Sequence, residues 1–150
     1  MAIVQAMTGS YKKEITAGIH YWTSHSRTGS SVINADTYYI AMFTSSRTDA
    51  NQDLTGYTAT NEVTDSGGVY AAGGLALGSV TLGLADNSGG TATAFLDFAD
   101  TTWASSTISN ARCALIYNYT LSTAGTGGTT THAAKPSVCV LDFGGNKSSS

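Results

Sequence analysis

The sequence predicts an all-β fold, mainly an antiparallel β-sandwich or barrel, with one short helix near the N-terminus. Short apolar runs with a period of two recur along the chain, and clusters rich in glycine, serine, threonine and asparagine separate them. A chain of 150 residues normally forms one domain and buries about 68–70% of its unfolded surface. A core of this size is stable without a disulfide or a structural metal. We expect an N-terminal arm with the helix over residues 1–36 and a single β-sandwich domain over 37–150, one domain overall.

The predicted helix lies just after residue 10. Ser10 is a suitable N-cap, Ile15 and Ile19 are four residues apart, and Gly18 is suited to ending the last turn. The following segment, 20–35, is polar and has no period, which is typical of an arm or a long loop.

The first strand is predicted over residues 37–43, where apolar side chains fall on both alternating sets and indicate cover on both faces. A second apolar run covers residues 75–84, and its phase slips by one residue at Gly78-Ser79, which predicts a β-bulge. Residues 86–90 have the composition of a turn.

Three more strands complete the predicted sheet. They cover residues 92–98, residues 111–119 with a start as early as Ile108, and residues 138–143. Between the last two, residues 123–131 are low in complexity and predict a hairpin tip or loop. Pro136 just before the final strand is tolerated, because its missing N–H falls outside the ladder.

The chain carries few charges for a soluble domain. Charged residues make up 11% of it, against about 25% in ordinary domains, and serine, threonine, asparagine and glycine replace them. A neutral surface loses water at little cost, so this composition suits a subunit that neighbours cover in an assembly. A robust extracellular β-domain would share the composition. Nucleic acid is not an expected partner, because the net charge is −3 and the basic residues cluster only at Lys12-Lys13.

Membrane insertion and disulfide formation are not expected either. The N-terminal residues lack the basic and apolar regions of a signal peptide, and no run approaches the ~20 apolar residues of a membrane span. Cys113 and Cys139 lie in apolar runs and are interpreted as reduced core residues.

No catalytic, metal or cofactor site is predicted, and no small-molecule substrate. The chain has no G-x-S-x-G sequence, and its cysteines lack the C-x₂-C spacing of zinc sites. His20, His25 and His132 are therefore interpreted as solvated loop residues.

The most informative charged residues are Asp97, Arg112 and Asp142. Each aspartate shares a strand face with apolar side chains, and Arg112 lies in the middle of a strand, so we expect an ion pair that fixes strand register. A glycosidase-like carboxylate pair or a calcium site is the functional alternative.

Aromatic residues provide one packing anchor and one further option. Trp103 follows a strand end and is expected to plug one end of the sandwich. Tyrosines on strands are usually half-buried packing residues. The alternative is a platform that stacks against sugars or bases, formed by Tyr38, Tyr39, Trp103, Tyr117 and Tyr119.

Several segments in order resemble a family of small structural proteins of tailed-bacteriophage virions. The similar segments are 18–20, 37–46, 57–63, 67–74, 96–103, 112–118 and 140–147. The resemblance implies a non-enzymatic protein of the virion. Relatives continue past the lysine that Lys147 matches, so an edge strand is either missing here or supplied by a neighbouring subunit.

Within that family we expect a decoration, or cement, protein on the outer surface of the head. Its partners would be the major capsid protein and copies of itself, with a trimer as the state that suits shell three-folds. A tail, tail-fibre or head–tail joining component is the alternative, and a glycan-binding β-sandwich for host attachment is the third option.

Overall fold

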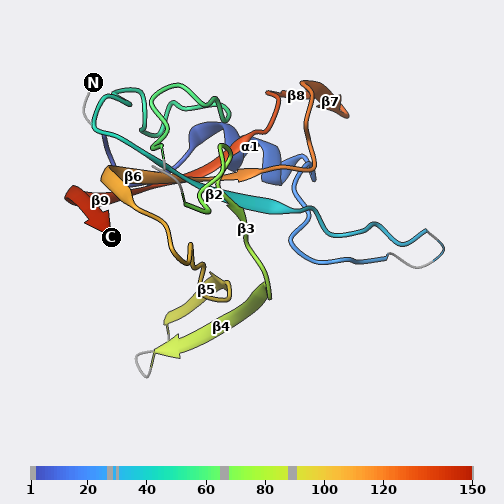
Figure 1. The fold of residues 1–150 in the computed structure, drawn as a ribbon. Helices are drawn as coiled ribbons and strands as arrows, with labels where there is room; N and C mark the ends of the chain where they lie inside the picture. The colour runs from blue at the N-terminus through green and yellow to red at the C-terminus, as the bar shows by residue number, and fades with distance from the viewer. Residues whose placement is uncertain (1–2, 27–28, 30, 65–67, 88–90, 150) are drawn as a thin grey trace.

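The computed structural model describes residues 3–26, 29, 31–64, 68–87 and 91–149. The described residues form one helix and nine strands (Figure 1), with these bounds in chain order: β1 (Ala6–Met7), α1 (Gly9–Thr16), β2 (Tyr38–Phe43), β3 (Leu75–Ala76), β4 (Thr81–Asn87), β5 (Thr91–Asp97), β6 (Ile108–Asn118), β7 (Gly125–Gly127), β8 (Thr130–His132) and β9 (Ser137–Ser149). All strand pairs between them are antiparallel. The predicted all-β class with one short helix is confirmed.

The strands form one main sheet and two separate hairpins. The main sheet has the order β1-β9-β6-β2-β3, while β4 pairs only with β5 and β7 only with β8. The long β6 and β9 form the centre of the main sheet, and three register shifts interrupt their ladder. Pro136 precedes β9, where its carbonyl accepts a hydrogen bond from the N–H of Asn118.

Both faces of β2 are covered, as its sequence predicts. Ala41 and Phe43 lie on one face, in a cluster that includes Leu54 from the long loop after β2. Tyr38 lies on the other face, against Tyr11 of α1 and other apolar side chains. Each large side chain buried in this way contributes about 1.5–3 kcal/mol to stability.

Helix α1 begins two residues earlier than its sequence indicates. Thr8, rather than Ser10, is the N-cap, and its hydroxyl accepts a hydrogen bond from the N–H of Tyr11. The hydroxyl of Ser10 contacts Thr8 and the carbonyl of Leu54 instead. Both side chains thereby tie the helix to the main body, which local sequence rules cannot anticipate.

The buried face of α1 also differs from the predicted one. Ile15 is exposed, while Tyr11 and Glu14 are buried and Ile19 is buried beyond the helix. As predicted, Gly18 follows the helix in the left-handed region, with φ of 68°.

The phase slip at Gly78-Ser79 is a change of sheet, and the predicted bulge is wrong. β3 pairs with β2, and β4 pairs with β5, so the chain leaves the main sheet between them. Ser79 has a φ of 52°, which turns the chain there. The predicted turn at 86–90 begins inside β4, which continues to Asn87, and its residues 88–90 lie outside the described residues.

Residues 3–22 belong to the main body. β1 pairs with β9 at the edge of the main sheet, and Trp22 is buried beside Tyr38. Residues 23–26, 29 and 31–35 lie in a segment that projects from the body instead, and its two sides meet at a bridge between His25 and Ile33 (Figure 1).

Candidate functional site

His20 lies at the centre of a buried polar network. Its Nε2 is 2.9 Å from a carboxylate oxygen of Glu14, and its Nδ1 is 3.3 Å from the side-chain amide of Asn118. That amide also donates to Asp36 at 2.8 Å, and Asp36 accepts from the N–H of Tyr21. The interpretation of His20 as a solvated loop residue is wrong, because helix α1 and β6 enclose it.

The network fits a neutral imidazole. Nε2–H donates to Glu14, and Nδ1 accepts from Asn118, so both ring nitrogens have a partner. Burial lowers the pKa of His20, although the carboxylate of Glu14 acts in the opposite direction. All three residues are almost fully buried, so the network can hold α1 on the sheet but offers no surface to a substrate.

The predicted ion-pair residues separate into a pair and a single residue. Arg112 on β6 forms a salt bridge with Asp142 on β9, and both side chains are half-buried. Asp97 does not join them. It ends β5 in the separate hairpin, is exposed, and accepts a hydrogen bond from the N–H of Phe98. Arg112 and Asp142 thus link the two central strands of the main sheet.

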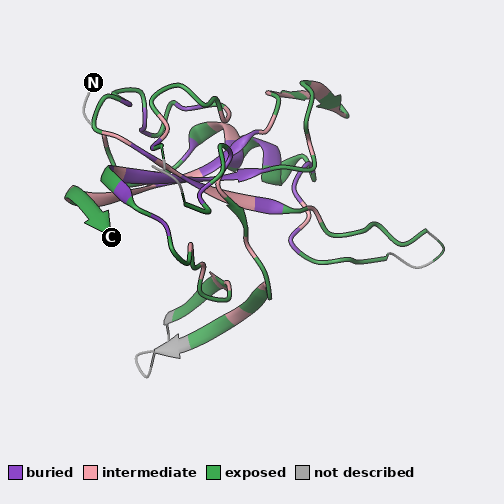
Figure 2. Cartoon of the chain, viewed as in Figure 1, coloured by how far each residue is buried: buried purple, intermediate pink, exposed green. Residues whose placement is uncertain are grey.

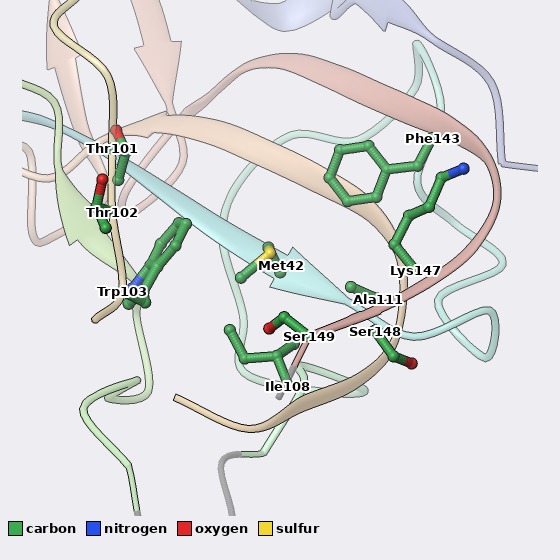
Figure 3. Close-up of a pocket in the computed structure, with 10 residues that line it drawn as sticks. All are labelled: Met42, Thr101, Thr102, Trp103, Ile108, Ala111, Phe143, Lys147, Ser148 and Ser149. Carbon is green, nitrogen blue, oxygen red and sulfur yellow. The ribbon is translucent and has the colours of Figure 1, made fainter. Parts of the chain in front are cut away.

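Trp103 lines an open hollow at one end of the main sheet (Figure 3). The hollow has a volume of about 530 Å³. Its walls carry apolar side chains, several hydroxyls and one ammonium group, from Met42, Thr101, Thr102, Trp103, Ile108, Ala111, Phe143, Lys147, Ser148 and Ser149. Trp103 is half-buried and packs against Tyr70, with ring centroids 5.5 Å apart. It therefore forms a wall at this end and leaves the hollow open.

A second concave surface lies between the main sheet and the β4–β5 hairpin. This groove has a volume of about 470 Å³ and is almost entirely apolar. Its walls are formed by Met7, Tyr11, Ile15, Trp22, Leu82, Ala94, Phe95, Leu96, Phe98, Ile116, Val138, Cys139 and Leu141. Since these walls carry no charged side chain, the groove suits an apolar occupant.

The β4–β5 hairpin projects from the body and is exposed (Figures 1 and 2). Leu82 and Leu84 lie on one of its faces and are 50% and 73% exposed, and Phe95 is 42% exposed. A ladder of two strands is marginally stable in water on its own. The sequence shows these leucines as ordinary strand residues, and only the slip at Gly78-Ser79 indicates that they leave the core.

The chain exposes more surface than a compact monomer of its mass. Its accessible area is 8432 Å², whereas a folded monomer of 15.4 kDa has about 7,200 Å². The difference is roughly 1,200 Å², and a specific interface covers about 800 Å² of each partner. Projecting elements therefore leave enough area for at least one neighbour.

Two further charged side chains, the buried Arg47 and the half-buried Glu62, hold loops in place, and the sequence analysis does not identify them. The Arg47 guanidinium donates to the carbonyls of Thr58 and Thr60. The carboxylate of Glu62 accepts from the hydroxyls of Tyr57 and Tyr70 and from the N–H of Gly73. No local pattern marks such residues, since their partners come from separate loops.

The cysteines are free thiols, in agreement with the sequence analysis. Cys113 and Cys139 lie on the neighbouring strands β6 and β9, on opposite faces of the sheet. Burial raises the pKa of each thiol to about 11, so both are protonated at neutral pH and weak as nucleophiles.

Two further kinds of feature, metal-binding clusters and membrane-spanning helices, are not found among the described residues. In this part of the chain, no group of three or more histidine, cysteine or acidic side chains is placed to share a metal ion. None of its helices is long and apolar enough to cross a membrane.

Comparison with protein-family models, with curated proteins and with solved structures finds no match to this chain.

Proposed function

We propose that this protein is a non-enzymatic structural subunit of a tailed-bacteriophage virion, and that it decorates and stabilises the outer surface of the head. The observation that carries this proposal is the projecting surface with its exposed leucines, in a chain that carries few charges. Exposed leucines on the β4–β5 hairpin and roughly 1,200 Å² of excess area are features of a chain that neighbours cover. The resemblance of the sequence segments to small virion proteins is the reason for proposing a phage particle as the assembly.

Stabilisation would follow from contact area across joints in the shell. A subunit that touches two capsid proteins adds binding energy that the shell alone lacks, and many copies repeat the gain. With charged residues at only 11% of the chain, few ions must lose water when such contacts form. Free strand edges, such as those of the β4–β5 hairpin, can also pair with strands of a neighbour.

The proposal is tested on particles of a phage whose genome encodes this chain. Peptide mass spectrometry should detect the chain in purified particles, and gel densitometry should show a copy number comparable with that of the major capsid protein. Added protein should also raise the temperature at which shells lacking it release their DNA. Absence of the chain from the particles would refute the proposal.

A tail, tail-fibre or head–tail joining component is the alternative location. It would use the same neutral contact surfaces, so the fold does not separate the two locations. Copy number does, because a tail component would be present at a small fraction of the level of the major capsid protein.

The hollow at Trp103 favours glycan binding as a second candidate function. A half-buried tryptophan beside the hydroxyls of Thr101 and Thr102 offers a sugar both a stacking surface and hydrogen-bond partners. Tyr38 and Tyr117 are buried, so they cannot contribute to such a platform. A glycan array of the wild type and of Trp103→Ala tests this function. Binding that is unchanged in Trp103→Ala would show that the glycan does not bind in this hollow.

A further inference from the structure

We propose that the leucine face of the β4–β5 hairpin and the apolar groove beside it form the contact between two copies of this chain. The inference rests on the proposed structural role and names one partner of its contact surface. It follows from how the hairpin is built, from the shape of this surface and from its charge.

The leucine face of the hairpin is half-buried at one end and exposed at the other. The register pairs Leu82 with Leu96 and Leu84 with Ala94, so these four side chains share one face. Leu96 is half-buried against the cluster around Ile116, whereas Leu84 is 73% exposed. The apolar face therefore extends beyond the cover that its own main sheet supplies.

A projecting side chain and a receiving groove are neighbours on one surface. Leu82 lines the groove, and Leu84 is the next residue on the same face of β4. A contact between identical surfaces about a two-fold axis requires each copy to present and to receive the same feature. Leu84 of each copy can enter the groove of the other, where Met7 and Ile15 are exposed.

Charge and area favour a second copy as the occupant. Identical charged surfaces would repel one another, but the walls of the groove carry no charge. The excess area of roughly 1,200 Å² is that of the whole chain and includes this surface, and a standard interface needs about 800 Å² from each partner. In a free copy the leucine face of this two-stranded ladder has only partial cover from its own main sheet, and a second copy would cover the rest.

The test is sedimentation velocity of the full chain over a wide range of concentration, with Leu84→Ser as the variant and Val69→Ser as the matched control. Val69 is also strongly exposed, at 65%, but lies outside the hairpin and the groove. We expect the wild type and Val69→Ser to associate equally. The dissociation constant of Leu84→Ser should rise about a hundredfold, because each of the two copies loses a contact worth about tenfold.

Hydrogen exchange provides a second readout that separates lost association from lost folding. Amides of β4 and β5 should be protected in the associated wild type and exchange rapidly in Leu84→Ser, while amides of β6 stay protected in both. Leu84→Ala serves as a milder variant if Leu84→Ser loses protection in β6. A wild type that stays monomeric, or association that Leu84→Ser and Leu84→Ala leave unchanged, would overturn the inference.

Its failure is distinguishable from failure of the proposed function. A monomeric chain that is nevertheless found in virions would overturn the hairpin contact and leave the structural role intact. A chain that associates through the hairpin but is absent from virions would refute the virion role and retain the contact.

Discussion

At the scale of single residues, buried and half-buried polar side chains stabilise the loops of this protein. Glu62 accepts three hydrogen bonds from two tyrosine hydroxyls and one backbone N–H, and these bonds join the loop after β2 to the segment before β3. Arg47 and Glu14 are buried, and each also has hydrogen-bond partners inside the fold. Leaving any of these groups without its partners would cost more than a surface ion pair contributes.

We predict that acid destabilises the protein through His20. Burial lowers the pKa of His20 in the folded state, so below about pH 6.5 the unfolded chain binds a proton that the folded chain does not. Stability from this group is complete above that pH and is lost as the pH falls. The melting temperature should drop by a few degrees between about pH 7 and pH 5, as measured by circular dichroism.

Two histidine variants isolate this effect. His20→Gln removes the titrating group and should flatten this part of the pH dependence, whereas His25→Gln, at an exposed position, should leave it unchanged. An identical pH dependence in wild type and His20→Gln would contradict the prediction.

We predict that Arg112→Met lowers the free energy of unfolding by about 1 kcal/mol, because it leaves the half-buried carboxylate of Asp142 without its cation. The N–H of Gly144 still donates to that carboxylate, which limits the loss. Urea denaturation of Arg112→Met, Asp142→Asn and the double variant measures the coupling between the two residues. Strictly additive effects would show that the pair contributes nothing.

The sequence alone predicted some of these side-chain contacts. Arg112 and Asp142 could be matched because both lie on long strands with a clear alternation. Asp97 shows the same alternation, but β5 belongs to a separate hairpin, and alternation does not reveal which strands pair. Contact between Glu14 and His20 was not predicted, since it depends on how the chain returns over α1.

At the scale of elements, the strands follow their period-two patterns closely. β2, β5 and β6 were predicted within a few residues, and β9 continues six residues beyond the predicted end at Phe143. Residues 144–149 are mostly polar and rich in glycine and serine, so no alternation marks them as strand. The break between β3 and β4 was misinterpreted because a bulge and a change of sheet shift the apolar phase in the same way.

We predict that Gly74→Ala disrupts the attachment of β3 to β2. Gly74 has a φ of 75°, and a Cβ atom there would lie 1.8 Å from the carbonyl oxygen of Ile40. The backbone must move, so the free energy of unfolding should fall by about 3 kcal/mol or more. Thermal or urea denaturation measures the loss.

Gly128→Ala is the matched control for that substitution. Gly128 has a φ of 62°, but a Cβ atom there would have no neighbour within 4 Å, so its replacement costs only the strain of the backbone, about 1 kcal/mol. Equal losses in both variants would contradict the role of close approach at Gly74.

At the scale of the whole molecule, low charge and large surface support the same function. Composition suggested that neighbours cover the chain, and the structure locates uncovered apolar area on the β4–β5 hairpin and its groove. Composition could not locate that area, because a leucine in a strand is equally compatible with the core and with an interface. The sequence therefore predicts assembly only in general, and the surface that we propose for it follows from the fold.

The most direct test of the account is a cryo-EM map of intact particles of a phage that encodes this chain. We predict density for the chain on the outer surface of the head, with the leucines of β4 covered by another subunit. A map in which the chain is absent, or in which the β4–β5 hairpin remains in contact with water alone, would contradict the account.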